Sequence, residues 1–301
     1  MRGYCSQTST KMNSCQTKFA ASLGVTLAML STSCSAQQGG LPGKEVAAGV
    51  REIGRIANPR LTESSGVAAS RQFPGILWTH TDGGSPKKQS LFAMRRDGSS
   101  VTEVFISDVF ITDWEDIAID DQKHVYLGDI GNNDARRPEL WVHQLDEPDP
   151  NANIRVIRPK RSWRLRFPGA PFDCESLFVW KDHGYVVSKV FKDSRAQIFR
   201  FPLADAKGPV TLELVATTKI ESPVTGADIS PDGKLLGLVA KSGAFVYRID
   251  GDVSRVIKAK PYQEKFRHEH IEGCTFVPEG LLATAESREI FLFTAPAFRG
   301  E

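Results

Sequence analysis

Short apolar segments recur along the chain in groups of three, and successive groups start 46 to 60 residues apart. The first segment of each group opens on small or acidic residues, and the five examples are "SSGVAAS" from Ser64, "WEDIAID" from Trp114, "CESLFVW" from Cys174, "GADISPD" from Gly226 and "EGCTFVP" from Glu272. A second apolar segment such as "HVYLGDI" follows, and then an amphipathic third such as "ELWVHQLDE". Turn residues separate the segments, so the pattern predicts units of three or four short strands.

Repeated units of this length without helical periodicity are typical of a β-propeller. The first two segments of each unit are apolar on both faces, as expected for strands packed between neighbouring blades. We predict an all-β, five-bladed β-propeller, or six blades if the long interval between the second and third units holds another one. The fifth unit lacks a fourth strand, and "VREIGRIA" from Val50 has no partner. We therefore expect an N-terminal strand near 50–57 to close the ring.

The N-terminal region has the layout of a secretory signal. Lys18 precedes an apolar run over residues 19–30, and small residues follow up to Ala36. The run is too short to cross a bilayer as a mature helix. We predict a signal peptide over 1–36, a linker over 37–49 and a single propeller domain over 50–298.

Two details of this region stay open at the level of the sequence. Translation could start at Met1 or Met12. The sequence "LSTSC" ending at Cys34 resembles a bacterial lipobox, which would give a lipoprotein signal ending before Cys34 and a lipid anchor on that residue. Soluble export is favoured because Leu30 lies four residues before Cys34, whereas the lipobox has leucine three before. Both routes predict export, to the periplasm or the extracellular space.

The charge balance excludes some classes of partner. Removal of Arg2, Lys11 and Lys18 with the signal reduces the 38 basic residues to 35, against 36 acidic ones, so the mature net charge is −1. A nearly neutral chain without a basic stripe predicts no nucleic acid partner. We expect a monomer whose partner is a small anionic substrate or a glycan. Cys174 and Cys274 lie in non-adjacent units, which favours separate buried thiols over a disulfide.

Acidic residues are placed so that the predicted fold would bring them together. In a propeller, the first strand of each blade starts at the mouth of the central channel and the second strand returns to it. The first segments start with Ser65-Gly66, Glu115-Asp116, Glu175-Ser176, Ala227-Asp228 and Glu272-Gly273. The second segments end with Asp82, Asp129, Lys189, Lys241 and Glu286. Eight carboxylates and two lysines are therefore predicted at one opening.

Such a cluster needs positive charge, because neighbouring carboxylates raise one another's pKa. Two lysines cannot neutralise eight acids, which leaves protonation or a bound cation. Oxygen ligands without clustered His or Cys favour Ca²⁺, whereas Mg²⁺ prefers a tight octahedron and retains its waters. A calcium ion with lysines beside it would bind an anionic oxygen ligand such as a phosphate ester.

Other conspicuous residues have simpler interpretations. Asp113 and Asp173 precede strands, and we expect them to hydrogen-bond loop amides. Trp114 is expected to pack between blades. His268 and His270 in "RHEH" lack a third His nearby, so a solvated loop is favoured over a metal site.

The string "ESSGVAAS…LWTHTDGG…DWEDIAID…YLGDIGNN…DCESLFV…TGADISPDG" resembles a group of secreted bacterial propeller proteins without an assigned activity. The resemblance covers nearly all of residues 58–295, and "DWEDIA" with "GDIGNN" is its most specific part. More loosely, an acid at each blade mouth is similar to the calcium-dependent propeller hydrolases, namely phytases, calcium-activated nucleotidases and gluconolactonases. The nucleotidases have a Glu-Trp strand start, which this chain matches only in part because Trp114 precedes Glu115.

The looser resemblance implies roles for the residues at the mouth. Calcium would be held by Glu115, Glu175, Asp228, Glu272 and Glu286. Substrate oxygens would be bound by Lys189 and Lys241, with Asp82 beside them, and Asp116 or Asp129 would activate water. The expected activity is hydrolysis of phosphate esters or related anionic esters.

Two functions of other classes remain as alternatives. One is a noncatalytic propeller with a structural cation, in which the funnel and the loop "GDIGNNDARRPE" bind a glycan or a protein. The other is a carboxylate-based glycosidase. The glycosidase is disfavoured because the predicted mouth has few aromatic residues for sugar stacking apart from Trp114 and Phe172.

Overall fold

The computed structural model describes residues 41–85, 88–190 and 195–301, of which Leu41–Glu301 form one compact unit. The predicted signal peptide, both candidate start sites and Cys34 lie outside the described residues. Within the described ranges, no helix has the length and apolar character needed to span a membrane.

Five mainly antiparallel sheets, each with four main strands, account for the fold. The innermost strands are β3 (Ser64–Ala69), β7 (Trp114–Ile119), β12 (Cys174–Trp180), β17 (Val224–Ile229) and β21 (Ile271–Val277). The second strands are β4 (Ile76–Thr81), β8 (His124–Asp129), β13 (His183–Ser188), β18 (Leu235–Ala240) and β22 (Gly280–Ala285). The third strands are β5 (Ser90–Arg95), β9 (Glu139–Asp146), β14 (Gln197–Pro202), β19 (Gly243–Arg248) and β23 (Glu289–Phe293). The fourth strands of the first four blades are β6 (Ser100–Ile106), β11 (Arg161–Arg166), β16 (Glu213–Thr217) and β20 (Tyr262–Lys265).

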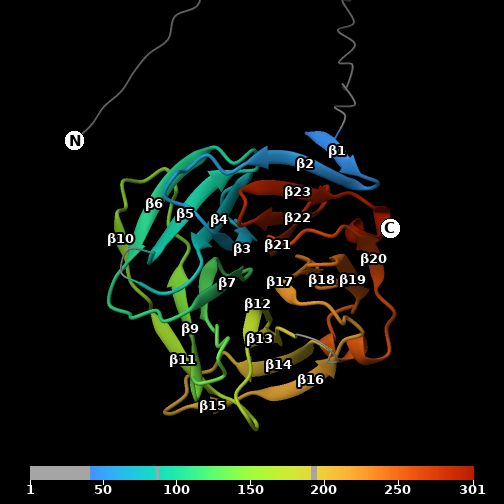
Figure 1. Ribbon diagram of the computed structural model, residues 1–301. Coiled ribbons are helices and arrows are strands. Elements are labelled where there is room, and N and C mark those ends of the chain that lie inside the picture. The colour runs from blue at the N-terminus through green and yellow to red at the C-terminus, as the bar shows by residue number, and fades with distance from the viewer. Residues whose placement is uncertain (1–40, 86–87, 191–194) are drawn as a thin grey trace, which may run out of the picture. The chain divides into compact units, whose positions relative to one another are not determined.

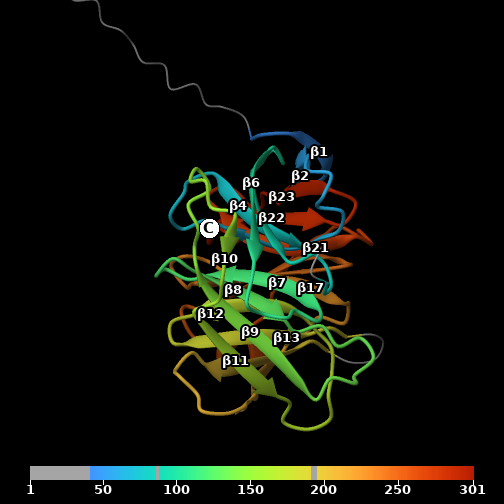
Figure 2. The ribbon, with the colours of Figure 1, turned by 90° about the vertical axis from the view of Figure 1, so that its left-hand side faces the viewer.

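These sheets form the blades of a closed ring. The innermost strands contact one another in the order β3, β7, β12, β17, β21 and back to β3. Figure 1 shows the five sheets around this centre, and Figure 2 shows the same sheets from the side. The five-bladed propeller predicted from the repeats is therefore confirmed.

The N-terminal strand closes the ring. β2 (Val50–Arg55) pairs with β23 and supplies the fourth strand of the last blade, as the sequence predicts. In Figure 1 the blue β2 runs beside the red β23. β1 (Lys44–Ala47) then pairs with β2, so a strand forms within the segment 37–49 that the sequence assigns to a linker.

The long interval between the second and third units contains no sixth blade. Between β9 and β11 the chain returns to the first blade, where β10 (Val156–Ile157) pairs in parallel with β6. The next blade repeats this detour, because β15 (Val210–Thr211) pairs in parallel with β11 of the second blade. Each detour thus extends the outer edge of the preceding blade. The only helices among the described residues are the 3₁₀ turns η1 (Val253–Ile257) and η2 (Pro296–Arg299).

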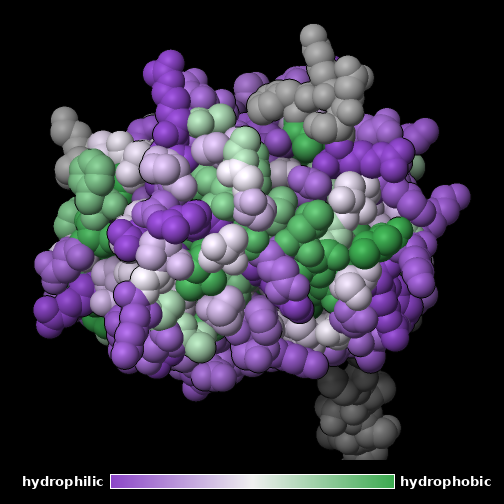
Figure 3. All heavy atoms as spheres, turned by 90° about the horizontal axis from the view of Figure 1, so that it is seen from below, coloured by the Kyte–Doolittle hydropathy of each residue, from purple (hydrophilic) through white to green (hydrophobic). Residues whose placement is uncertain are grey.

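The core lies between blades, as expected for strands that are apolar on both faces. Trp78 and Trp114 are fully buried in the cluster that joins the first and second blades. Cys174 and Cys274 are buried free thiols in different blades, which confirms the prediction of separate cysteines. The side of the molecule seen in Figure 3 is mostly hydrophilic, with apolar residues gathered in a band from its centre to the right and in a group at its left edge.

Candidate functional site

A β-bulge lies near the start of every innermost strand. The pairing with the second strand shifts register between Ser64 and Val67, Trp114 and Asp116, Cys174 and Ser176, Val224 and Gly226, and Ile271 and Cys274. A bulge leaves one residue unpaired and turns its side chain in a new direction. The first residues inside these bulges are Ser65, Glu115, Glu175, Thr225 and Glu272, and all five are buried.

Most of these bulge residues meet in one small cavity of about 70 Å³. It is lined by four of them, by ends of three second strands and by one loop residue: Ser65, Glu115, Glu175, Glu272, Asp82, Lys189, Glu286 and Asn133. Acids from four blades therefore share one opening. Lys241, at the equivalent position of the fourth blade, forms an ion pair with Glu272 beside this cavity.

Three carboxylates form the tightest cluster. Asp82, Asp113 and Glu115 each offer one oxygen, and these three oxygens lie within 4.8 Å of one another. The sequence interpretation of Asp113 as a ligand of loop amides missed this position. The sequence feature that could have indicated Asp113 is the Asp-x-Glu pattern of "DWE", which recurs as "DCE" with Asp173 one blade later. Asn133, which also lines the cavity, had no comparable signal.

The loop "GDIGNN" holds this cluster in place. Asp129 Oδ1 accepts a 2.8 Å hydrogen bond from the Asp113 amide, and the Gly131 amide donates to the Asp113 carbonyl at 3.1 Å. A β-carbon on Gly131 would lie 2.1 Å from Glu115 Oε1 and 2.3 Å from Asp113 Oδ2. Glycine is therefore required here by the close approach of two carboxylates, even though its backbone conformation is ordinary.

Further contacts within the loop fix its shape. The Arg137 guanidinium pairs with Asp129 Oδ1 at 2.9 Å and donates to the Gly131 carbonyl at 2.6 Å. The buried Asn132 amide donates to Asp173 Oδ1 at 2.7 Å. The loop thus links the second blade to the start of the third.

The available cations leave several carboxylates unpaired. Lys189 pairs with Glu175, and Lys241 pairs with Glu272. Across the described ranges, no ion pair reaches Asp82, Asp113 or Glu115. Among the acids in and beside the cavity, three buried carboxylate oxygens also lack a hydrogen-bond donor, namely Asp82 Oδ1, Asp173 Oδ2 and Glu272 Oε2.

The electrostatic cost of this arrangement appears in the pKa values. Burial, reinforced by the neighbouring carboxylates, raises the pKa of Asp113 to about 6 and that of Glu115 well above its ordinary value. Burial also raises the pKa of Glu272 to about 7 and that of Glu175 to about 8, although a lysine beside each opposes the shift. A divalent cation among these groups would favour their ionised forms.

The strand register shows that the sequence alignment of the repeats places Asp228 at the wrong position. Val224 pairs with Ala240 as Trp114 pairs with Asp129, which makes Thr225 the counterpart of Glu115. Asp228 lies three residues further along its strand, where its carboxylate accepts from Thr275 Oγ1 and the Phe276 amide of the next blade. It does not line the cavity, so we leave it out of the proposed metal ligands.

The sequence alignment also places Asp129 wrongly, by one residue. It is the residue that pairs with the start of β7, so Ile130 and not Asp129 is the counterpart of Asp82. Because alternate strand residues face opposite sides, this one-residue offset turns Asp129 away from the cavity. Its carboxylate contacts Arg137 and the Asp113 amide instead.

Asp116 also lies away from the cavity. It is fully buried, and its two oxygens accept 2.8 Å hydrogen bonds from the amide of Ile117 and from the amide of Leu177 in the next blade. With both oxygens engaged, it cannot contact substrate at the mouth. Asp116 therefore joins two blades.

We expect Asp116→Ala to destabilise the fold. The substitution would leave two buried amides without an acceptor, at about 1–3 kcal/mol each, which corresponds to a loss of roughly 5–15 °C in Tm for a domain of this size. Urea denaturation of this variant and of Asp121→Ala, an exposed control, would measure the difference. Equal stabilities of the two variants would contradict the role of Asp116 between blades.

The two histidines of "RHEH" do not form a metal site together. His270 is exposed and its Nδ1 lies 3.1 Å from Glu286 Oε2, at the rim of the cavity. His268 stacks on Phe266, and its ring lies edge-on to that of His270 with the two centroids 6.3 Å apart.

Comparison with known proteins gives only remote likenesses. No family model matches the chain, and no curated protein matches it. Among solved structures, an X-ray structure of a protein provisionally assigned as a gluconolactonase is 17% identical, with a TM-score of 0.44, over 76% of this chain and 72% of the other. The hydrazine synthase of Kuenenia stuttgartiensis is 12% identical, with a TM-score of 0.43, over 77% of this chain and 72% of the other. Neither likeness bears on activity, and the assignment of the fold rests on the sheets themselves.

Proposed function

We propose that this protein is an exported, calcium-dependent hydrolase of small anionic esters, such as phosphate esters. The observation that carries the proposal is the cluster of Asp82, Asp113 and Glu115, whose oxygens converge without a cation partner in the described part of the chain. The export component rests on the signal-like segment 1–36 of the sequence. Calcium sites outside the cytoplasm commonly bind in the 10⁻⁴–10⁻³ M range, which is the affinity expected here.

The donor set fits a calcium ion. Ca²⁺ takes six to eight oxygens at roughly 2.3–2.6 Å, so two oxygens on one ion are at most about 5 Å apart. The three clustered carboxylates meet this limit. Glu175, Glu272 and Glu286 supply further oxygens in the same cavity, and Gly131 keeps the space between Asp113 and Glu115 open.

The surrounding residues suit hydrolysis of an anionic ester. A bound cation would polarise a phosphoryl or carbonyl oxygen. Lys189 lines the cavity and adds positive charge to it. Asp113 is half-buried at this cluster, and a bound cation would keep its carboxylate ionised, so an oxygen that does not hold the ion could accept a proton from a neighbouring water.

The cavity size restricts what can enter. About 70 Å³ is far below the roughly 300–1,000 Å³ of typical ligand pockets. Only the reacting group of a substrate would enter the cavity, and the remainder would lie outside. No aromatic side chain is among the described residues that line it, which disfavours the glycosidase alternative.

A noncatalytic propeller with a structural cation is the second candidate. It is favoured by one observation, namely that Lys189 and Lys241 are already paired with Glu175 and Glu272. Lysines held in this way would fix the walls of the cavity and leave less charge for a substrate.

Thermal melting with and without Ca²⁺ tests the shared premise. Free Ca²⁺ at ~100 times Kd should stabilise the fold by about 2.7 kcal/mol, or ~5–10 °C in Tm. Glu115→Gln should lose this shift, whereas the exposed control Glu221→Gln should keep it. If Ca²⁺ leaves the wild-type Tm unchanged, the proposal fails.

Hydrolysis assays separate the two candidates. With p-nitrophenyl phosphate, bis-p-nitrophenyl phosphate and a lactone panel, we expect Ca²⁺-dependent release of product that a chelator abolishes. Asp113→Asn should lower kcat strongly while Glu221→Gln has no effect. Calcium stabilisation without cleavage of any ester would favour the structural cation.

The stability of the ion-free protein should fall as pH rises. Asp113, Glu272 and Glu175 have pKa values of about 6, 7 and 8 in the fold, above the ~4 of the unfolded chain. The folded state therefore binds more protons than the unfolded state between about pH 4 and 8. The free energy of unfolding is highest at the low end of this range and falls as the pH rises through it. Calcium requires the ionised groups, so its stabilising effect should grow over the same range. Melting curves from pH 4.5 to 8.5, with chelator or with Ca²⁺, measure both trends, and parallel curves would contradict them.

A further inference from the structure

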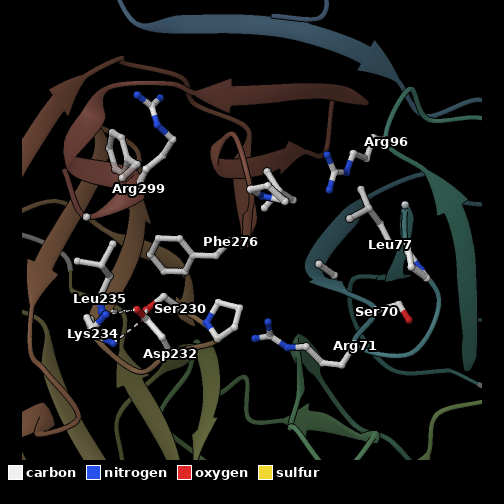
Figure 4. A pocket seen from close by; sticks show the side chains of 18 of the residues that line it. Ser70, Arg71, Leu77, Arg96, Ser230, Asp232, Lys234, Leu235, Phe276 and Arg299 are labelled. Carbon is white, nitrogen blue, oxygen red and sulfur yellow. Dashed lines mark hydrogen bonds and ion pairs between the residues drawn. The ribbon is translucent and has the colours of Figure 1, made fainter. Parts of the chain in front are cut away.

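A second, larger pocket lies at the opposite end of the channel. The second residue of β21, Glu272, lines the acidic cavity, and its last residue, Val277, lines this pocket. Ser65 and Ala69 of β3 line the two sites in the same way. The pocket has a volume of about 580 Å³, within the range of small-molecule sites. Turns of the first, fourth and fifth blades and the C-terminal residues surround it (Figure 4).

The lining combines an apolar wall with an excess of positive charge. The apolar side chains include Leu77, Leu235, Phe276 and Phe298. The cationic side chains are Arg71, Arg96, Lys234, Arg248 and Arg299, whereas Asp232 is the one acid among the lining residues. The pocket therefore has the opposite charge to the cavity at the other mouth.

Arg71 differs from the other four cations of this pocket. Each of those has a carboxylate neighbour, in the pairs Arg96 with Glu279, Lys234 with Asp232, Arg248 with Asp250, and Arg299 with Glu301. Within the described residues Arg71 forms no ion pair, and its buried Nε has no hydrogen-bond acceptor.

The position of Arg71 suits an anchor for an anion. Its side chain extends across the pocket toward the turn that carries Ser230 and Asp232 (Figure 4). The partly buried carboxylate of Asp228 attracts Arg71 electrostatically, but this carboxylate already accepts hydrogen bonds from Thr275 and from the Phe276 amide. A guanidinium with unused donors gains most from a carboxylate, sulfonate or phosphate group.

We propose that this pocket binds a small organic anion with an apolar body, whose charged group pairs with Arg71 and whose body packs on Phe276 and Leu77. The site is independent of the proposed calcium chemistry, because it shares no lining residue with the acidic cavity. It would allow the propeller to bind a ligand at each end of its channel.

Two fluorescent probes with similar aromatic bodies test the proposal on the full chain in the presence of a chelator. 8-Anilino-1-naphthalenesulfonate carries a charge and N-phenyl-1-naphthylamine does not. We expect one saturable site for the sulfonate, weakened about 10-fold or more in Arg71→Gln. Arg71→Lys keeps the charge but loses the planar set of donors, so it should bind the sulfonate more tightly than Arg71→Gln and more weakly than the wild type. The control Arg95→Gln, an exposed arginine outside the pocket, should have no effect.

Displacement identifies the chemistry of the ligand, and melting curves establish that each variant is folded. Octanoate should displace the sulfonate probe, whereas octanol should not. Equal binding of the sulfonate to the wild type and to Arg71→Gln would overturn the proposal. So would displacement by octanol as strong as that by octanoate.

Discussion

The variant Gly131→Ala is expected to lose the calcium response while the propeller remains folded. The added β-carbon would lie 2.1 Å from Glu115 Oε1 and 2.3 Å from Asp113 Oδ2, so at least one carboxylate must leave its position. A carboxylate displaced by about 1 Å can no longer share the ion with its neighbours, so we expect the affinity for Ca²⁺ to fall by about 100-fold or more. Changes in residues that merely support the ligands of a metal site typically cost ~10–100-fold in affinity.

Calorimetric titration with Ca²⁺ measures this effect directly. Gly169→Ala is the matched control, because no atom lies within 4 Å of the β-carbon it would add. The control should bind Ca²⁺ as the wild type does. Wild-type affinity in Gly131→Ala would show that Asp113 and Glu115 do not hold the ion together, and the proposed site would have to move.

Removal of the closing strand should have the largest effect on stability. A chain starting at residue 58 lacks β1 and β2, which leaves the outer edge of β23 unpaired and removes the fully buried Val50 from the core between the last two blades. The ion pair of Arg55 with Glu289 is lost as well. We expect a loss of more than ~5 kcal/mol, comparable with the entire stability of many domains, together with aggregation through the exposed edge.

The comparison requires a chain that starts at residue 41 and retains both strands. Circular dichroism should show a cooperative melt for this chain and none for the shorter one. A synthetic peptide covering residues 41–57 should restore part of the transition by adding the missing strand. A cooperative melt of the shorter chain within a few degrees of the longer one would contradict ring closure by β2.

The two ends of the channel have opposite chemistry in the same set of strands. The bulges at the start of β7, β12 and β21 turn Glu115, Glu175 and Glu272 into the acidic cavity. At the other end, Arg71 follows the end of β3 and enters the larger pocket. The buried carboxylate of Asp116 and the partly buried one of Asp228 lie between the two ends, where they link neighbouring blades.

The sequence by itself determined the fold and part of the site. Five recurrences of the same segment order predicted five blades, and an unpartnered strand near residue 50 predicted how the ring closes. Acids repeated at one position of the unit predicted that Glu115, Glu175 and Glu272 approach one opening. These inferences succeeded because they depend on the spacing of repeats and not on the orientation of single side chains.

Only the tertiary structure decided which acids face the cavity. The inner strands are buried on both faces, so no alternation of apolar and polar residues fixes their register. The bulges add a further shift that local composition does not indicate. For this reason Asp116, Asp129 and Asp228 do not line the cavity, while Asp113 lies in the cluster with Asp82 and Glu115. The Arg71 pocket depends on turns from three blades, and its residues become neighbours only when the ring closes.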